Sequence, residues 1–440
     1  MSTQLDADFF RGHRDEYLNR LGSDFALLCA PAVSIRNGDA DYRYRQESSF
    51  YYLTGWEHPE AVALFRPGTE QPFILFVQPK DPAREIWTGR RPGPEGAMQT
   101  FGADQAFAFD ELAEKLPELV QGASQLHYAF GGDREMDDLL LGAIRKARQK
   151  AHRNGLEVPS NFADPSTILG ELRLLKSEAE LERIRKAVAI TVDAHLAAMK
   201  QARVGIPEYE LESIIDGTFR SRGGNGAGYT SIVAAGDNAT ILHYIENDDV
   251  AEEDELVLID AGCEFEYYTA DLTRTWPVNG RFTAAQRALY DVVLEAHEAV
   301  LAFAAPGVAF QDLHDLAVRR LTEGMVRIGL LEGEVDELIA EGTFRRFYMH
   351  KTGHWLGLDV HDVGRYFVDG QSRPLEPGML FTVEPGLYVG ADDEEAPEAF
   401  RGIGIRIEDD VLVVEGGVEV LSDSLPRDAD AIEAIVGTAN

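Results

Sequence analysis

Two kinds of apolar pattern alternate along the first part of the chain. Residues 25–29 and 73–77 are short, continuous apolar runs with the length of buried strands. Residues 139–152 show helical spacing instead and end in basic residues, which predicts a helix. Helix and strand signals that alternate in this way are typical of an α/β domain. We therefore predict an α/β domain in the N-terminal part of the chain.

The pattern changes near residue 170, where we expect a domain boundary. Residues 158–165 contain two prolines and several small polar residues, which indicates the approach to a linker. We place the N-terminal domain at residues 1–172 and the second domain at residues 173–440.

Two long amphipathic helices are predicted after this boundary. Ser177 and Glu180 have the spacing of a capping box and begin a helix that extends to about Arg203. Residues 283–304 repeat the pattern, with a Thr and a Gln three residues apart at the start. Each helix is followed by Pro and Gly, so the passages 177–207 and 283–307 suggest an internal duplication.

The acidic composition bears on the possible partners. The chain has 440 residues, of which 45% are hydrophobic, enough for the cores of two domains. Its 41 basic and 76 acidic residues give a formal net charge of −35. A surface of this sign repels nucleic-acid phosphates and anionic membranes, so we expect neither as a partner. The acidic runs at 252–255 and 392–395 are typical of solvated turns.

Cysteine content and apolar runs suggest a cytoplasmic location. The chain has only two cysteines, Cys29 and Cys263, which do not indicate a disulfide framework. We interpret Cys263 as a buried free thiol rather than a ligand. Residues 1–8 contain early acids and no apolar core of a signal peptide. No run approaches the roughly 20 apolar residues that a membrane-spanning helix needs.

The candidate chemistry begins with two acids in apolar runs. Asp260 ends the apolar stretch 256–260, and Asp271 begins a Thr-rich stretch that suits a second strand. A hairpin would set the two acids opposite each other, with side chains about 5 Å apart on one face. Carboxylates that close share a proton or a cation. The alternative is that two unrelated acids flank a turn.

Three histidines lie in a glycine-interrupted segment between residues 350 and 362. Glycine breaks any helical pattern there, so we predict a loop or a short edge strand. Imidazole is both a common neutral metal ligand and a proton carrier near pH 7. We assign His354 as a ligand, and His350 and His361 as groups on the substrate side.

Two glutamates complete the candidate site. Glu384 lies in the run 382–388, and Glu408 lies in 404–410. On a strand, Arg406 and Glu408 share one face, which is either solvated or turned into a cavity. Four carboxylates and one imidazole can hold a pair of divalent ions, which typically lie about 3.5–4 Å apart and make a hydrolytic nucleophile at neutral pH. The predicted ligands are Asp260, Asp271, His354, Glu384 and Glu408.

These runs together resemble aminopeptidase P, the Xaa-Pro aminopeptidase of the pita-bread metallopeptidase family. The resemblance covers nearly the whole chain, with local departures at 351–353 and 364–374. It is carried by residues 260–262, 271–275, 353–362, 383–386 and 401–410, together with 45–55 and 85–91 in the N-terminal part.

The resemblance implies both a fold and an activity. It implies an α/β (α+β) fold, with an N-terminal creatinase/prolidase-like α/β domain of the aminopeptidase P type at 1–172 and a catalytic pita-bread domain at 173–440. The implied enzyme is a metal-dependent aminopeptidase that releases the N-terminal residue from peptides with proline in the second position, by attack of a metal-bridging hydroxide. It also implies a homo-oligomer, either a tetramer or a dimer.

The resemblance further implies individual roles. Glu384 would carry the proton of the attacking water to the leaving nitrogen, and His361 and His243 would stabilise the oxyanion. Asp260 and the ions would bind the free amine. Without the resemblance, His243 would be interpreted as a packed strand residue. The implied substrate-binding residues are His350, Arg406, Tyr388, Tyr229 and Trp87, of which Trp87 would reach into a neighbouring subunit's site.

Metal identity and substrate length leave alternatives open. An oxygen-rich ligand set without thiolate fits a hard divalent ion, so we expect Mn²⁺, with Co²⁺ or Zn²⁺ as alternatives. A dipeptide-cleaving prolidase is the second candidate function, and a non-catalytic peptide-binding module is the candidate from a different class. The long N-terminal domain disfavours methionine aminopeptidase, and the intact ligand set disfavours both an enzyme of the creatinase type and the non-catalytic module.

Overall fold

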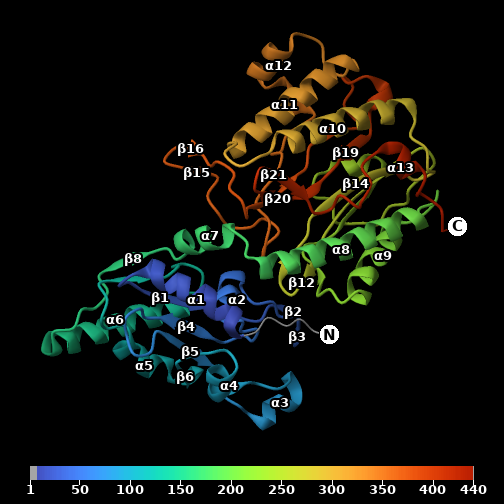
Figure 1. Cartoon of the computed structure of the whole chain (residues 1–440). Coiled ribbons are helices and arrows are strands. Elements are labelled where there is room, and N and C mark those ends of the chain that lie inside the picture. Colours follow the sequence, from blue (N-terminus) through green and yellow to red (C-terminus); the bar gives the residue numbers. More distant parts are fainter. Residues whose placement is uncertain (1–6, 440) are drawn as a thin grey trace. The chain divides into compact units, whose positions relative to one another are not determined.

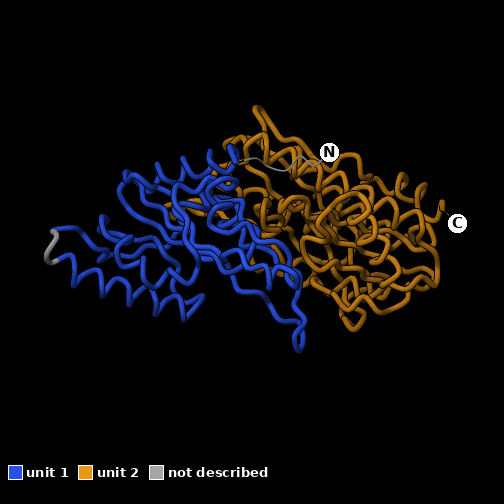
Figure 2. The backbone as a smooth tube through the Cα atoms, turned by 90° about the horizontal axis from the view of Figure 1, so that it is seen from below, with its two compact units in different colours: residues 1–172 blue, residues 173–440 orange. Residues whose placement is uncertain are grey.

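The computed structural model describes residues 7–439, except for the side chains of residues 152–154. Residues 1–6, on which the expected lack of a signal peptide partly depends, lie outside the described residues. The chain divides into two compact units, residues 1–172 and residues 173–440, coloured separately in Figure 2. Among the described residues, no helix has the length and apolar character needed to cross a membrane.

The N-terminal unit is built on a mixed six-stranded sheet with the order β6-β5-β4-β1-β7-β8 (Figure 1). The three central strands pair antiparallel, and the outer strands join them in parallel. The strands are β1 (Phe25–Cys29), β4 (Val62–Phe65), β5 (Phe73–Val77), β6 (Gln105–Ala108), β7 (Gln125–His127) and β8 (Asn161–Ala163), and a separate pair is formed by β2 (Ile35–Asn37) and β3 (Ala40–Asp41). The helices are α1 (Ala7–Leu21), α2 (Ser48–Thr54), α3 (Pro82–Thr88), α4 (Gly93–Gln99), α5 (Leu112–Leu119) and α6 (Arg134–Asn154).

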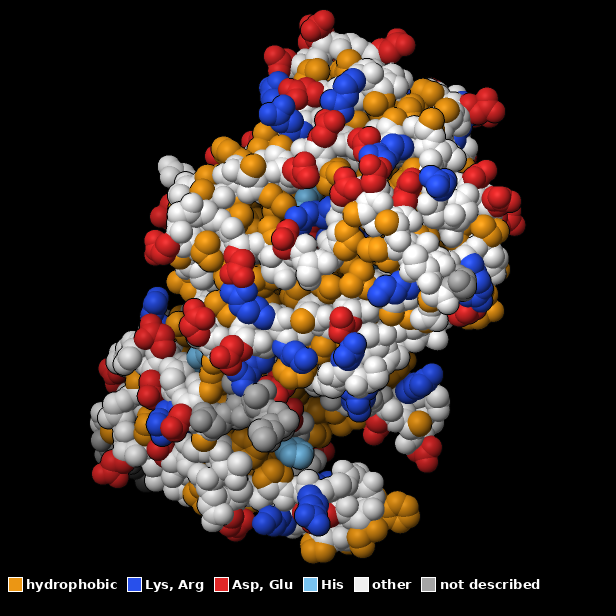
Figure 3. Space-filling view, turned by 45° about the vertical axis from the view of Figure 1, so that its right-hand side comes forward, with side chains coloured by type: hydrophobic (Ala, Val, Ile, Leu, Met, Phe, Trp, Pro, Cys, Tyr) orange, Lys and Arg blue, Asp and Glu red, His pale blue; other side chains and the backbone are white. Residues whose placement is uncertain are grey.

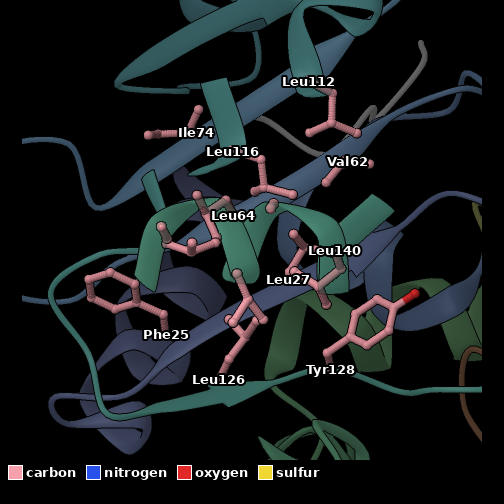
Figure 4. Packing of buried hydrophobic residues seen from close by; sticks show 14 of the residues in the cluster. Phe25, Leu27, Val62, Leu64, Ile74, Leu112, Leu116, Leu126, Tyr128 and Leu140 are labelled. Atoms are coloured by element: carbon pink, nitrogen blue, oxygen red, sulfur yellow. The ribbon is translucent and has the colours of Figure 1, made fainter. Parts of the chain in front are cut away.

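Alternate residues of these strands form the core of the unit. Leu27, Leu64 and Leu126 lie on one face of the sheet, as the two-residue period of a strand requires. Leu116 and Leu140 cover that face from α5 and α6, at positions with helical spacing. Figure 4 shows these side chains meeting between the strands and the helices.

The structure confirms both predicted strands of this unit and corrects two other predictions. Helix α6 begins at Arg134, five residues before the predicted start, because Asp133 caps it by accepting from the N–H groups of Glu135 and Met136. Residues 158–165 do not form only a linker. They contain strand β8, which extends the sheet beside β7.

The C-terminal unit contains two pairs of long helices. The pairs are α8 (Glu178–Gln201) with α9 (Glu208–Ser221), and α10 (Ala284–Phe303) with α11 (Phe310–Arg327). Both predicted capping boxes are present, at Ser177 and at Thr283. The other helices are α7 (Ser166–Leu174), which includes the unit boundary, α12 (Val335–Glu341) and α13 (Ala429–Glu433).

Each helix pair is followed in the chain by a three-stranded antiparallel sheet. The first sheet has the order β10-β11-β14 and the second the order β17-β20-β21. Their strands are β10 (Ile232–Ala235), β11 (Leu256–Ala261) and β14 (Leu272–Pro277), then β17 (Leu380–Val383), β20 (Asp409–Val414) and β21 (Gly417–Val420). Smaller sheets are formed by β9 (Gly226–Ala227), β12 (Cys263–Phe265) and β13 (Tyr268–Thr269), by β15 (Phe367–Val368) with β16 (Gln371–Ser372), and by β18 (Gly386–Val389) with β19 (Ile403–Arg406).

Strand β14 connects the first sheet to the segments that follow the second helix pair (Figure 1). Thr273 forms an isolated bridge with Glu408, and the Thr275 hydroxyl donates to the carbonyl of Arg406. Segments more than 130 residues apart in the chain are thereby held side by side. This contact brings the first and last candidate ligands to the same place.

The acidic excess is visible on the surface of the molecule. On the face shown in Figure 3, Asp and Glu side chains are scattered among Lys and Arg. The acidic run at 392–395 lies in a turn, as predicted, and Asp393 there pairs with Arg346. Both cysteines are free thiols, and Cys263 is buried.

Candidate metal centre

All five predicted ligands line one cavity of about 540 Å³ in the C-terminal unit. The four carboxylates lie within a strand or close to the end of one, and His354 lies in a loop. Asp260 lies in β11, and Asp271 directly precedes β14. His354 lies in the loop before β15, Glu384 directly follows β17, and Glu408 lies between β19 and β20. Strand ends are rigid, so the four carboxylates are positioned by the sheets. The ligands are Asp260, Asp271, His354, Glu384 and Glu408.

The predicted pairing of Asp260 with Asp271 is wrong in register. In the antiparallel pair of β11 and β14, Asp260 lies opposite Thr273, and Ala261 lies opposite Leu272. The intervening residues do not form a simple turn, because β12 and β13 belong to a separate small sheet. The two carboxylates nevertheless approach a common point, since the Tyr229 hydroxyl lies 2.6 Å from Oδ1 of Asp260 and 2.5 Å from Oδ1 of Asp271.

Asp271 has a central place among the ligands. Ligand atoms of Asp271, His354 and Glu408 all lie within 4.8 Å of one another. Nε2 of His354 is 3.3 Å from Oδ2 of Asp271 and 3.7 Å from Oε1 of Glu384. Asp271 therefore contacts the hydroxyl that it shares with Asp260 through Oδ1 and contacts His354 through Oδ2.

Electrostatics indicate that this cavity suits cations. Burial, followed by the charge of Asp260, raises the pKa of Asp271, and burial raises the pKa of Glu384 to about 7. Burial and the charge of Asp271 raise the pKa of Glu408 well above its ordinary value. Burial would lower the pKa of His354, but its hydrogen bond to Asp271 and the charge of Glu384 outweigh this effect and raise it to about 9. Divalent cations relieve such crowding of negative charge, so the donor set fits a metal pair.

The loop that carries His354 is fastened to β17. The Thr382 N–H donates to the His354 carbonyl, and the Glu384 N–H donates to the Thr352 carbonyl. Gly353 is required between them, because a Cβ atom there would lie 1.9 Å from the Thr382 carbonyl oxygen. Nδ1 of His354 lies 3.0 Å from the Trp355 carbonyl, so it donates there and leaves Nε2 directed at the carboxylates.

Arg406 and Glu408 both face the cavity, and neither is solvated. Arg406 is 4% exposed and Glu408 is 2% exposed. Arg406 donates through one terminal nitrogen to Oδ2 of Asp260 at 2.7 Å and through the other to the Tyr388 hydroxyl at 2.9 Å. The shared face that strand alternation predicted is therefore directed inward.

Four further histidines line the cavity, namely His243, His314, His350 and His361. Nε2 of His350 lies 2.9 Å from the Tyr388 hydroxyl, and burial, with the charge of Arg406, lowers the pKa of His350 to about 3. The ring of His361 lies 4.4 Å from that of His354. His243 is exposed in a loop after the 3₁₀ turn Gly236–Thr240, so the interpretation of a packed strand residue is wrong.

The other predicted substrate-binding residues lie elsewhere. The Tyr388 hydroxyl is hydrogen-bonded to Arg406 and to His350. The Tyr229 hydroxyl contacts the carboxylates of Asp260 and Asp271. Trp87 belongs to α3 of the N-terminal unit, and 85% of its surface is exposed.

Sequence reasoning missed Thr273. Its hydroxyl donates to Oε2 of Glu408 at 2.6 Å and accepts from Nε of Arg406 at 3.1 Å. Thr273 follows Asp271 by two residues, so strand alternation places both on the same face, and that signal was available in the sequence. Asp410 was also missed. Its carboxylate accepts a hydrogen bond from the backbone N–H of Asp271 at 3.2 Å.

Comparisons with known proteins identify the family to which the chain belongs. Residues 182–415 match the model of metallopeptidase family M24, and residues 10–128 match that of the aminopeptidase P N-terminal domain. The chain is 44% identical to an Xaa-Pro aminopeptidase of Escherichia coli, with 99% of each chain covered. The structure of the Pseudomonas aeruginosa aminopeptidase PepP is 44% identical and superposes with a TM-score of 0.96, covering 99% of each chain. A zinc-substituted Escherichia coli aminopeptidase P in complex with product is 42% identical, with a TM-score of 0.95 and full coverage of both chains.

The chain therefore belongs to metallopeptidase family M24. The resemblance to aminopeptidase P that the motifs indicated is confirmed, as is the combination of an α/β N-terminal domain with a pita-bread domain.

The central position of Asp271 generates a prediction about metal binding. We expect Asp271→Ala to weaken binding of divalent metal by more than about 100-fold. Loss of an outer-shell partner already costs up to about 100-fold in metal affinity, and loss of a direct ligand should cost more. Metal titration by calorimetry and elemental analysis of the purified protein measure the change. Glu298→Ala, which removes an exposed acid of α10, is the matched control and should bind metal normally. Normal metal content in Asp271→Ala would contradict the assignment.

Proposed function

We propose that this protein is a metal-dependent Xaa-Pro aminopeptidase. It releases the N-terminal residue from peptides whose second residue is proline. The observation that carries the proposal is the convergence of four carboxylates and one imidazole in a cavity that four more histidines also line. The similar proteins named Xaa-Pro aminopeptidase support the substrate class. The division at 172/173 would separate the N-terminal domain of the aminopeptidase P type from the catalytic domain.

Five side chains would hold two divalent ions in this enzyme. When bound, such ions supply a water of lowered pKa as the nucleophile and polarise the scissile carbonyl. We propose Mn²⁺ as the native metal, with Co²⁺ or Zn²⁺ as alternatives, because the oxygen-rich ligand set contains no thiolate. The ligands are Asp260, Asp271, His354, Glu384 and Glu408.

Glu384 would move the proton during hydrolysis. Its Oε1 faces His354 and its Oε2 faces His350, each at 3.7 Å, so the carboxylate lies between the ligands and the proposed proline side. From this position it accepts a proton from the attacking water and returns it to the leaving nitrogen. The Thr352 carbonyl fixes the backbone of Glu384, which keeps the carboxylate in this orientation.

Two cavity histidines would bind the reacting carbonyl. His243 and His361 come from different loops, and both present exposed rings to the cavity. Burial, together with the charge of His354, lowers the pKa of His361, so its neutral imidazole is favoured, and this form can donate one N–H. An N–H group directed at a developing oxyanion stabilises the transition state more than the ground state.

The proline side would be shaped by His350, Arg406 and Tyr388, of which His350 and Arg406 line the cavity. The Tyr388 hydroxyl joins the other two side chains, at 2.9 Å from each. This arrangement gives a rigid wall with one uncharged imidazole and one fixed guanidinium. The ring side chains suit a flat pyrrolidine, and the cation suits the carbonyl that follows it. Asp260 would bind the free amine of the substrate, which restricts cleavage to the first bond.

We also propose a homo-oligomer, either a tetramer or a dimer, with Trp87 completing the site of a neighbouring subunit. Trp87 and Ile86 are adjacent, and more than 80% of each is exposed, which is unusual for large apolar side chains. We propose a cytoplasmic location as well, which the two free thiols support.

The proposed role of Glu384 predicts a loss of turnover without loss of metal. Glu384→Gln keeps the shape but removes the base, so we expect kcat to fall by at least about 100-fold. Steady-state kinetics measure the change, and elemental analysis must show that the variant is fully metallated. Glu376→Gln, at an exposed glutamate before β17, is the control. A fully metallated Glu384→Gln enzyme with normal kcat would remove Glu384 from the mechanism.

The substrate class predicts a ranking of peptides. We expect Xaa-Pro-Xaa tripeptides to be cut after the first residue, with kcat/KM about 100-fold above that for Xaa-Ala-Xaa, the range that pocket contacts supply. Xaa-Pro dipeptides should be poorer than tripeptides. A series of these three peptides, assayed with Mn²⁺ and after chelation, tests the ranking. If dipeptides are the only good substrates, the enzyme is a prolidase, and if no peptide is cut, it is a binding module.

The proposed subunit contact predicts complementation between two defective variants. Trp87→Ala should reduce activity while metal content stays normal, whereas Ile86→Ala should have little effect. Co-expression of Trp87→Ala with Glu384→Gln should restore part of the activity, because one subunit then supplies Trp87 to a site with intact Glu384. A fully active monomer by light scattering, or no complementation, contradicts the proposal.

A further inference from the structure

Glu208 is a buried carboxylate outside the candidate metal centre. It is the first residue of α9, and only 1% of its surface is exposed. A buried carboxylate is costly unless hydrogen-bond donors surround it. Its partners therefore show what the fold uses it for.

Four hydrogen bonds converge on this carboxylate. Oε1 accepts from the Ala235 N–H at 2.7 Å and from the Asn238 side-chain amide at 3.1 Å. Oε2 accepts from the Tyr244 hydroxyl at 2.8 Å and from the Asp249 N–H at 2.9 Å. All four donors lie at the start, within or at the end of one loop, residues 235–249.

This loop carries His243 to the cavity. Leu242 and His243 line the cavity, whereas the next residue, Tyr244, is buried against Glu208. Asn247 is also buried and holds the loop to β10, because its side chain bonds to the Val233 N–H and the Ser231 carbonyl. Tyr244 and Asn247 thus anchor the buried side of the loop, and His243 lies on the side that faces the cavity.

We propose that Glu208 is a positioning residue that sets His243 over the metal centre by fastening both ends and the middle of loop 235–249. The proposal rests on the proposed function insofar as His243 binds the substrate carbonyl. Glu208 itself does not line the cavity. Its effect on catalysis is therefore transmitted through the loop.

A carboxylate is required at this position because each oxygen accepts two hydrogen bonds. In Glu208→Gln, one oxygen becomes an amide nitrogen, which is a donor. If the nitrogen takes the place of Oε2, it meets the N–H of Asp249, and if it takes the place of Oε1, it meets the N–H of Ala235. Burial and the hydrogen bond to Glu208 raise the pKa of Tyr244, so its hydroxyl keeps the proton that it donates. The isosteric variant therefore changes the loop anchor without changing volume.

The first measurement is hydrogen–deuterium exchange of the full-length metallated enzyme. Glu208→Gln should speed exchange in peptides covering residues 235–249 and leave peptides covering β11 and β14 unchanged. The matched control is Glu210→Gln, which alters a partly exposed glutamate of the same helix that pairs with Arg203. If Glu208→Gln is not folded, Tyr244→Phe, which removes a single hydrogen bond, carries the same expectation. Unchanged exchange in the loop overturns the proposal.

The second measurement is a double-mutant cycle with His243→Ala on an Xaa-Pro-Xaa peptide. Glu208→Gln should lower kcat/KM by about 10- to 100-fold, the size of effect that a displaced catalytic group produces, with metal content unchanged. In the His243→Ala background, Glu208→Gln should have almost no further effect, because the group through which it acts is gone. A purely structural role would lower activity equally in both backgrounds and overturns the proposal.

The two measurements separate the positioning role from the proposed function. If the loop loosens and the cycle is non-additive, the positioning role of Glu208 is supported. If the loop loosens but His243→Ala alone leaves kcat/KM unchanged, the role of His243 in the proposed function is wrong, and the positioning of a catalytic group is overturned with it. If His243→Ala lowers kcat/KM and Glu208→Gln does not, the proposed function stands and Glu208 has no positioning role.

Discussion

The crowding of four carboxylates in one buried cavity is the constraint on which the C-terminal unit depends. Two unit charges 4 Å apart repel by about 4 kcal/mol at the effective dielectric of a protein near its surface. The fold counters this repulsion with donors placed between the acids. Tyr229 lies between Asp260 and Asp271, Thr273 donates to Glu408, and Arg406 donates to Asp260. Because a phenol has one proton, Tyr229 cannot satisfy both carboxylates, and a cation between them is the natural complement.

A second layer of buried charge holds the strands that carry these ligands. The side chain of Arg274 is fully buried and points away from Asp271 and Thr273, on the other face of β14. It donates to the carbonyl of Glu408 at 2.6 Å and to Oδ1 of Asp409 at 2.8 Å. Burial would raise the pKa of Asp409, but the charges of Arg274 and other nearby cations outweigh it and lower that pKa. The segment that begins at Asp271 and continues into β14 thus presents the candidate ligand Asp271 on one face. On its other face, Arg274 holds the backbone next to the candidate ligand Glu408.

The features that could be predicted from the sequence are those that depend on residues close together in the chain. The capping boxes at Ser177 and Thr283 and the strands around residues 25–29 and 73–77 depend on neighbouring residues, so the sequence was enough. The candidate ligands were singled out because their runs resemble those of aminopeptidase P, and their role as ligands stays a prediction. The register of Asp260 was not predictable, since a separate hairpin at 263–269 takes up the residues that a simple turn would use. Glu208 was not recognisable either, because a glutamate in the first turn of a helix is ordinarily solvated.

The contrast between the candidate carboxylate ligands, which lie within strands or close to their ends, and the histidines, which lie in loops, follows from what each group must do. Metal ligands need fixed separations, so the fold places them within strands or at their ends, and a loop residue such as His354 is fastened to β17 by backbone hydrogen bonds on both sides. Groups that contact a peptide need to reach across a cavity, and loops provide that reach at the cost of rigidity. The loop of His243 is held by the buried carboxylate of Glu208, which accepts four hydrogen bonds from residues of the loop. A loop held in this way can keep an imidazole in place while leaving its outer face open to the substrate.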